Sequence, residues 1–201
     1  MLGHWEIPAV RMYRSRFINI DDLGRTIASI TNAKRILEIG CGDGAVAEVL
    51  CREFPAASYL GIDVAPTPGR LFRGDLARAE FRSIRSADLL AEEPEPFDLV
   101  VIVDVVHHVP EDQRAALLGD AAALVAPGGT VVVKEWERGS GLAHLAAYTA
   151  DRYVSGDTTV RFLPQAELRQ LIATGLPGFG VVCEARIPPR RNNLLLALRA
   201  D

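Results

Sequence analysis

Two hydrophobic patterns alternate along this chain. Short, mostly apolar runs typical of buried strands are separated by segments in which apolar residues recur at helical spacing. The runs predict strands at 35–39, 58–63, 81–84, 99–103, 130–133, 180–187 and 193–199. The helical segments lie at 21–32, 44–54, 110–126 and 164–175, with room for one short helical piece at 71–80. Alternating strands and helices favour a parallel sheet with helices on both faces.

The last two predicted strands differ from the others in their connection. They are joined by a short segment around Pro188-Pro189-Arg190-Arg191, whereas parallel neighbours need a crossover of about a dozen residues or more. We therefore expect an α/β fold with a doubly wound, seven-stranded, mostly parallel sheet that ends in an antiparallel hairpin.

A glycine-rich turn follows the first predicted strand. The chain reads Gly40-Cys41-Gly42-Asp43-Gly44, and apolar residues then recur at helical spacing. Glycines let a backbone turn tightly and let a ligand approach it closely, and the start of a helix offers free N–H groups. Strand, glycine turn and helix together predict a unit that cradles a cofactor.

Acidic residues around this turn narrow the choice of cofactor. Gly40, Gly42 and Ala45 satisfy the fingerprint of dinucleotide-binding proteins. However, Asp43 lies in the turn, where it would repel a pyrophosphate at the helix start, unless it caps the helix instead. Glu38, within the strand, suits a cationic group of a ligand better than a phosphate.

A third acid ends the second predicted strand. Asp63 follows Gly44 by 19 residues, and an acid at this interval can bind the hydroxyls of a ribose. A ribose together with a cationic group, and without a phosphate, describes S-adenosylmethionine. The alternative ligand is NAD, which the acid in the turn disfavours.

Five segments of the chain carry a resemblance to a known family. They are Leu37-Glu38-Ile39-Gly40-Cys41-Gly42-Asp43-Gly44, Gly61-Ile62-Asp63, Ser86-Ala87-Asp88-Leu89, Phe97-Asp98-Leu99-Val100 and Pro127-Gly128-Gly129. In this order they resemble the motifs of the class I S-adenosylmethionine-dependent methyltransferases, over roughly residues 30 to 200. The resemblance implies a Rossmann-like methyltransferase fold and an enzyme that methylates a small molecule and releases S-adenosylhomocysteine.

The resemblance also implies which residues contact the cofactor. The positions that match are Glu38, Gly40, Cys41, Gly42, Gly44, Asp63, Ala87, Asp88, Leu89 and Asp104. Within this set, Asp88 is expected at the adenine amino group. The segment Ala65-Pro66-Thr67-Pro68-Gly69 departs from the family pattern, because its helix-breaking residues stand where a helix usually begins.

Two adjacent histidines are the candidates for a general base. Methyl transfer to a group of high pKa requires removal of a proton, and His107 and His108 follow the fourth predicted strand at the edge where open α/β sheets bind ligands. A structural role fits these histidines as well. Lesser candidates are Glu135, His144 and Tyr148. Because adjacent strand residues point to opposite faces, we expect no metal site at the two histidines.

Composition and charge limit the class of protein. The 201 residues suit one domain, and 49% are hydrophobic while 24% are charged. A formal net charge of −4 gives no general attraction to nucleic acid. There is no apolar run of the roughly 20 residues that a membrane span requires. Because the first residues include Glu6 and form no apolar h-region, we expect no secretory signal. Three cysteines without metal or redox spacing favour a reduced, cytoplasmic protein.

We expect a single methyltransferase domain over 1–201, with an N-terminal arm and helix at 1–30 and a substrate cap at 137–163. The arm either packs on the domain or closes over the site, where an arginine would meet an anionic substrate. The preferred function is O- or N-methylation of a small molecule. The alternatives are an NAD-dependent oxidoreductase, which the terminal hairpin disfavours, and a module that binds the cofactor without catalysis.

Overall fold

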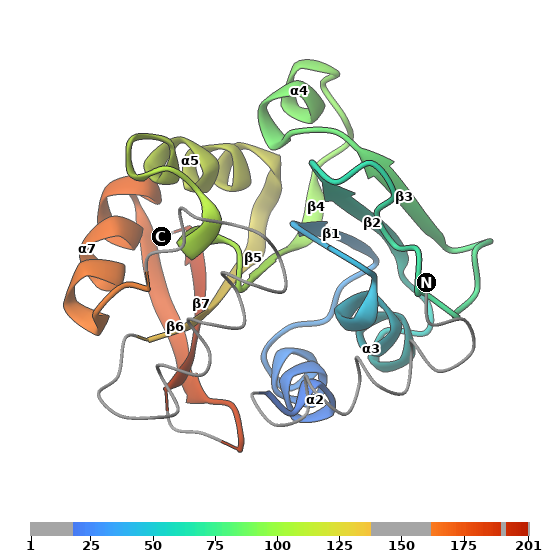
Figure 1. Ribbon diagram of the computed structural model, residues 1–201, viewed down its shortest axis with the longest axis horizontal. Helices are drawn as coiled ribbons and strands as arrows, with labels where there is room; N and C mark the ends of the chain where they lie inside the picture. The colour runs from blue at the N-terminus through green and yellow to red at the C-terminus, as the bar shows by residue number, and fades with distance from the viewer. Residues whose placement is uncertain (1–17, 138–161, 190–191, 201) are drawn as a thin grey trace.

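One mixed sheet forms the centre of the structure (Figure 1). The structure is a computed structural model, and it describes residues 18–137, 162–189 and 192–200. The strands are β1 (Arg35–Ile39), β2 (Ser58–Asp63), β3 (Ala79–Ser83), β4 (Phe97–Val103), β5 (Val125–Trp136), β6 (Phe179–Arg186) and β7 (Asn193–Ala200). Strands β1 to β5 pair in parallel, and β7 pairs antiparallel with both β5 and β6. The predicted fold class and terminal hairpin are therefore confirmed.

The strand order places a ligand site at a defined point of the sheet. The order is β3-β2-β1-β4-β5-β7-β6, so the chain runs outward from β1 in one direction and from β4 in the other. The connections after these two neighbouring strands diverge at their carboxyl ends. In open α/β sheets, ligands bind in the crevice that this reversal creates.

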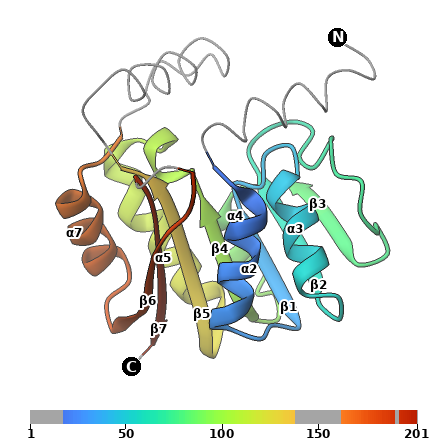
Figure 2. The same cartoon turned by 90° about the horizontal axis from the view of Figure 1, so that it is seen from below.

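Helices cover both faces of the sheet (Figure 2). They are α2 (Ile20–Ile30), α3 (Ala45–Glu53), α4 (Ser86–Ala91), α5 (Arg114–Leu124) and α7 (Gln165–Gly175), with short 3₁₀ turns η2 (Val106–His108) and η3 (Glu111–Gln113). The buried side chains of α2 and α3 form one core with one face of the sheet. Those of α4, α5 and α7 form a second core on the other face.

Strand β4 shows how the sequence specifies this layering. Its continuous apolar run predicts burial on both faces, and Leu99 to Ile102 are all fully buried. Because side chains alternate along a strand, Leu99 and Val101 pack in the α2–α3 core, whereas Val100 and Ile102 pack in the other. Because β4 is held by both cores, it fixes the point at which the loop after Val103 leaves the sheet.

Several element boundaries differ from the predicted ones. Helix α2 is capped by Asn19, whose Oδ1 accepts a hydrogen bond from the N–H of Asp22, so the aspartates lie in the first turn. The segment predicted to begin a helix at Pro110 first forms η3, and α5 begins only at Arg114. Strand β5 begins at Val125, earlier than predicted. Its pairing with β4 shifts register between Phe97 and Leu99.

Two further differences concern the edge formed by β2 and β3. The structure contains no helix between residues 64 and 78, where the short helical piece was expected. Conversely, residues 86–91 form helix α4, where the pattern predicts only a loop. Pro66, Pro68 and Gly69 disfavour a helix only up to residue 69. In α4, Leu89 is buried and packs in the core.

Parts of the predicted arm and cap lie outside the described residues. These are residues 1–17 of the arm and 138–161 of the cap, including His144 and Tyr148. The domain boundaries and the cap therefore remain predictions. Among the residues that are described, none belongs to a helix long and apolar enough to cross a membrane.

Candidate functional site

The glycine turn between β1 and α3 has the conformation and the space that a bound ligand requires. Gly40, Gly42 and Gly44 have φ values of +79°, +51° and +91°, a region that favours glycine. A Cβ on Gly40 would lie 2.3 Å from Cγ2 of Val105, so the loop after β4 packs directly on the turn. Among the described residues, a Cβ on Gly42 would meet no atom within 4 Å. The open space beside Gly42 is where a ligand can approach the backbone.

Two aspartates hold this turn in place. Asp63 at the end of β2 accepts hydrogen bonds from the N–H of Gly42 through Oδ2 and from the N–H of Ala65 through Oδ1, each at 2.8 Å. Asp43 accepts one from the N–H of Ala45, at 3.2 Å, and so serves the start of α3. The structure therefore brings Asp63 to the glycine turn, as the predicted ribose contact requires, and supports the capping role considered for Asp43.

Glu38 and Cys41 shape the turn from beneath. Glu38 is 1% exposed, and its Oε2 accepts a hydrogen bond of 2.5 Å from the hydroxyl of Tyr59. Burial and the charge of Glu38 raise the pKa of Tyr59 well above its usual value. Burial likewise raises the pKa of the Cys41 thiol, which packs against Gly61. The side chains of both predicted cofactor contacts thus face the interior.

Three of the predicted cofactor contacts, Ala87, Asp88 and Leu89, lie on α4. Ala87 and Asp88 are exposed, so they are available to a ligand at this edge. Leu89 is 1% exposed and packs in the core, and its contact with the cofactor remains a prediction. Because a helix has 3.6 residues per turn, adjacent residues face different sides, so Leu89 is buried while Ala87 and Asp88 are exposed.

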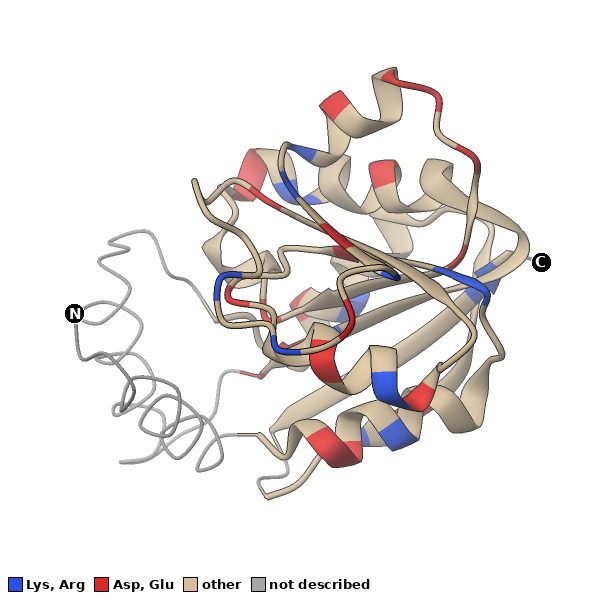
Figure 3. Ribbon diagram, turned by 90° about the vertical axis from the view of Figure 1, so that its right-hand side faces the viewer, with Lys and Arg blue, Asp and Glu red and all other residues tan. Residues whose placement is uncertain are grey.

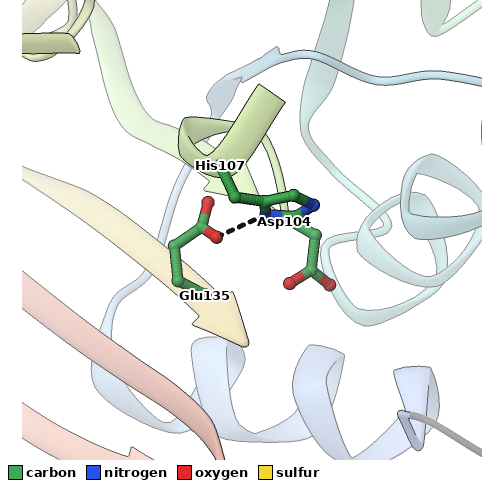
Figure 4. A group of neighbouring side chains, drawn as sticks. All are labelled: Asp104, His107 and Glu135. Carbon is green, nitrogen blue, oxygen red and sulfur yellow. Dashed lines mark hydrogen bonds and ion pairs between the residues drawn. The ribbon is translucent and has the colours of Figure 1, made fainter. Parts of the chain in front are cut away.

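Glu135, at the end of β5, binds several groups of the loop after β4. Its Oε1 accepts hydrogen bonds from the N–H groups of Val105 and Val106, at 2.9 and 2.7 Å. Its Oε2 lies 2.7 Å from Nδ1 of His107 (Figure 4). The carboxylate is 2% exposed, and hydrogen bonds to a buried carboxylate are among the strong ones. Glu135, a lesser candidate from sequence, thereby fixes the orientation of the histidine.

The two histidines occupy different environments within η2. His107 is 3% exposed, and its ring stacks on Phe162 with centroids 4.8 Å apart. His108 is half-buried, and its ring lies 4.1 Å from that of His107. The expectation that the rings point to opposite faces is wrong, because these residues form a 3₁₀ turn rather than a strand.

Asp104, His107 and Glu135 form a group of metal-binding type, because their ligand atoms lie within 4.8 Å of one another (Figure 4). The oxygens of Glu135, however, already accept from two backbone amides and pair with the imidazole. The ammonium of Lys134 lies 2.6 Å from Oδ2 of Asp104, where it supplies a positive charge. The arrangement is a hydrogen-bonded network with its own cation.

The hydrophobic pattern does not single out Lys134 or Phe162. Lys134 is 1% exposed and directly follows the apolar run of β5, whereas Phe162 precedes α7, far from His107 in the sequence. A lysine that continues a buried strand is the only sequence signal for the first residue. No local pattern identifies the second, because its contact with the histidine depends on the tertiary fold.

Known proteins that resemble this chain are methyltransferases. A family profile described as a methyltransferase domain matches residues 37–131, which include the glycine turn, Asp63 and the loop after β4. The chain is 29% identical over 216 aligned positions to the ubiquinone biosynthesis O-methyltransferase of Xylella fastidiosa strain M23. That alignment covers 99% of this chain and 83% of the relative.

Solved structures share the fold. An O-methyltransferase family protein from Burkholderia thailandensis superposes with a TM-score of 0.66 at 17% identity, covering 90% of this chain. This chain spans only 57% of that protein. A 1,6-didemethyltoxoflavin N1-methyltransferase from the same organism, solved with S-adenosylhomocysteine, gives a TM-score of 0.65 at 17% identity and covers 92% of this chain and 80% of its own.

Proposed function

Since the chain belongs to the class I S-adenosylmethionine-dependent methyltransferases, we propose that it methylates a hydroxyl oxygen of a small molecule, with His107 as the general base. The observation that carries this proposal is the pairing of His107 with Glu135 on a loop that packs against the glycine turn. The pairing orients an imidazole beside the place where the cofactor is expected.

The glycine turn and its neighbours fit S-adenosylmethionine. The open space beside Gly42 admits a ligand to the backbone, and Asp63 at the edge of the turn suits the ribose hydroxyls. Glu38, Asp43 and Asp104 add negative charge around a cofactor that carries a sulfonium. When bound, this cofactor supplies a methyl group whose bond to sulfur breaks as the acceptor attacks.

Glu135 determines which nitrogen of His107 is basic. With Nδ1–H donating to the carboxylate, the lone pair of the ring lies on Nε2. In the proposed step, Nε2 would take the proton of the acceptor hydroxyl as that oxygen attacks. The Glu135 carboxylate then stabilises the imidazolium that results. A base placed in this way contributes about 10²–10⁴-fold to a rate.

The comparisons favour oxygen as the accepting atom. The Xylella relative is named for O-methylation, and an oriented base is of most use to a hydroxyl, whose pKa is high. An amine is the alternative acceptor, because the structural neighbour that binds S-adenosylhomocysteine is an N-methyltransferase. A neutral amine can attack without a base, so this alternative assigns His107 no role in the chemical step.

Transfer of a labelled methyl group tests the proposal. The full chain is incubated with methyl-labelled S-adenosylmethionine and matched phenols and anilines, and the products are analysed by mass spectrometry. We expect label on hydroxyl oxygens and its loss in His107→Gln. The matched variant His108→Gln, which changes the neighbouring ring, should retain most of the activity. Label on nitrogen alone, at the same rate in both variants, would contradict the proposal.

We further propose that the partner is a small molecule in a reducing compartment such as the cytoplasm. Acidic and basic residues are interspersed along the ribbon that Figure 3 shows. This distribution supports no nucleic-acid surface. Cys41, Cys51 and Cys183 are free thiols, which suits a reducing environment.

A further inference from the structure

A buried lysine lies next to the site and has no role in the mechanism above. Lys134 is 1% exposed, and its Nζ lies 2.6 Å from Oδ2 of Asp104. The backbone joins the same residues, since the N–H of Asp104 donates to the carbonyl of Lys134 at 2.8 Å. Removing two charges from water offsets much of their attraction, so such pairs are weak contributors to stability. The place of this pair in the site indicates a role in orientation.

Asp104 is held in an unusual state. Its φ of +55° is left-handed, which is uncommon for a residue other than glycine and is found at sites that the surrounding structure constrains. While Oδ2 pairs with Lys134, Oδ1 is buried and has no hydrogen-bond partner in the part of the chain that the structure describes. A buried acceptor without a donor is costly, and a bound ligand that donates a hydrogen bond removes that cost.

The position and charge of Asp104 define the donor. Asp104 directly precedes Val105, which packs on Gly40 of the glycine turn, so Asp104 belongs to the loop that borders the expected cofactor site. Its neighbours His107 and Glu135 contribute one further negative charge within the same cluster. Lys134 alone does not balance two carboxylates, so a positively charged donor is favoured over a neutral one.

We propose that Lys134 is a positioning residue, which fixes Asp104 so that Oδ1 accepts a hydrogen bond from the ammonium group of S-adenosylmethionine. This inference rests on the cofactor of the proposed function, but not on the acceptor or on the base. It is therefore tested by binding alone, with no acceptor present, and failure of the proposed methyl transfer would leave the test intact.

In Asp104→Asn, an NH₂ group replaces one carboxylate oxygen, so one hydrogen-bond acceptor becomes a donor. The ammonium of Lys134 can only donate, so it selects the amide oxygen of the new side chain. The amide nitrogen then takes the place of Oδ1. Because this nitrogen donates, it cannot accept the hydrogen bond that the ammonium group of the ligand offers. Affinity for S-adenosylhomocysteine should fall by about tenfold or more. Affinity for 5′-methylthioadenosine, which lacks the amino-acid part, should stay unchanged. Isothermal titration calorimetry measures both.

A second variant tests the role of Lys134. In Lys134→Met/Asp104→Asn the amide is free to rotate and can present its oxygen to the ligand. This double variant should bind S-adenosylhomocysteine more tightly than Asp104→Asn does. Lys134→Arg/Asp104→Asn keeps a cation that only donates, so it should remain as weak as Asp104→Asn. A lysine that merely supports the fold predicts no recovery in the double variant.

Asp98→Asn is the matched control for loss of a carboxylate. Asp98 belongs to the same strand, β4, but it binds the backbone N–H groups of Lys34 and Arg35 at the opposite end. This variant should bind both ligands as the wild type does. Equal loss of both affinities in Asp104→Asn, or unchanged affinity for S-adenosylhomocysteine, would overturn the ammonium contact. Absence of recovery in the methionine double variant would overturn the role of Lys134.

Discussion

At the scale of single residues, the site is held together by carboxylates that each accept hydrogen bonds from several donors. Glu135 holds two backbone amides and one imidazole, and Asp63 holds two amides. A carboxylate can do this because both oxygens accept, whereas an amide has only one accepting oxygen. Isosteric replacements by Gln or Asn therefore change hydrogen-bond polarity with little change of shape.

Glu135→Gln should switch the tautomer of His107. The two backbone N–H groups of Val105 and Val106 require the amide oxygen, so the amide nitrogen must face Nδ1. Nδ1 then accepts, the proton moves to Nε2, and the ring is no longer a base toward the acceptor. We expect kcat to fall by about 10²–10⁴-fold with little change in S-adenosylhomocysteine affinity. A wild-type kcat in this folded variant would refute the orientation of His107.

Gly42→Ala should separate cofactor binding from folding. The new Cβ would enter the open space beside the turn, at a φ of +51° that costs about 1 kcal/mol for alanine. Gly178→Ala is the matched control, since Gly178 also has a positive φ, +78°, and a Cβ there would meet no atom of the described residues within 4 Å. Both variants should lose similar unfolding free energy, but only Gly42→Ala should lose S-adenosylhomocysteine affinity. Equal affinity in the two variants would show that no ligand approaches this turn.

At the scale of elements, the site depends on contact between two loops at the carboxyl ends of β1 and β4. Gly40→Ala would place a Cβ 2.3 Å from Cγ2 of Val105, so the loop after β4 must move. We expect weaker cofactor binding and slower turnover. Adding Val105→Ala removes the atoms that clash and should recover part of both. If the second substitution recovers neither, strain at Gly40 rather than the contact between loops accounts for the loss.

The elements that could be predicted from the sequence are those set by local pattern. The continuous run of β4 and the glycine turn after β1 are recognisable because period, length and glycine placement act within a few residues. Helix α4 could not be predicted, since only one leucine of its six residues is deeply buried. The Lys134–Asp104 and Glu135–His107 pairs could not be predicted either. They join β5 to the loop after β4, and this proximity arises from sheet order rather than from sequence spacing.

At the scale of the whole molecule, buried ionisable groups link stability to pH. Burial raises the pKa of the Cys51 thiol from 9.0 to about 11, and the pKa of Tyr59 is raised as well. The unfolded chain therefore loses these protons at lower pH than the folded chain, so the folded state is weakened as pH rises through this range. The stabilisation is complete below about pH 9 and is lost progressively toward pH 11.

Denaturant unfolding at several pH values measures this loss. The unfolding free energy of the wild type should decline between about pH 9 and 11. Cys51→Ala should decline less steeply over the same interval, although its stability at neutral pH is lower because a buried sulfur is lost. Cys183→Ala is the control, because Cys183 lies on β6 and is only half-buried. Identical slopes in the wild type and Cys51→Ala would contradict the role of that thiol.

The central claim is that His107, oriented by Glu135, removes a proton as the methyl group is transferred. The most direct test is the pH dependence of a single turnover in the wild type, His107→Gln and His108→Gln, with cofactor saturating and a hydroxyl acceptor. The wild-type rate should fall on the acid side as the imidazole becomes protonated. His108→Gln should keep this dependence, whereas His107→Gln should be slower by about 10²–10⁴-fold and lose it. An unchanged rate and an unchanged acid limb in His107→Gln would contradict the claim.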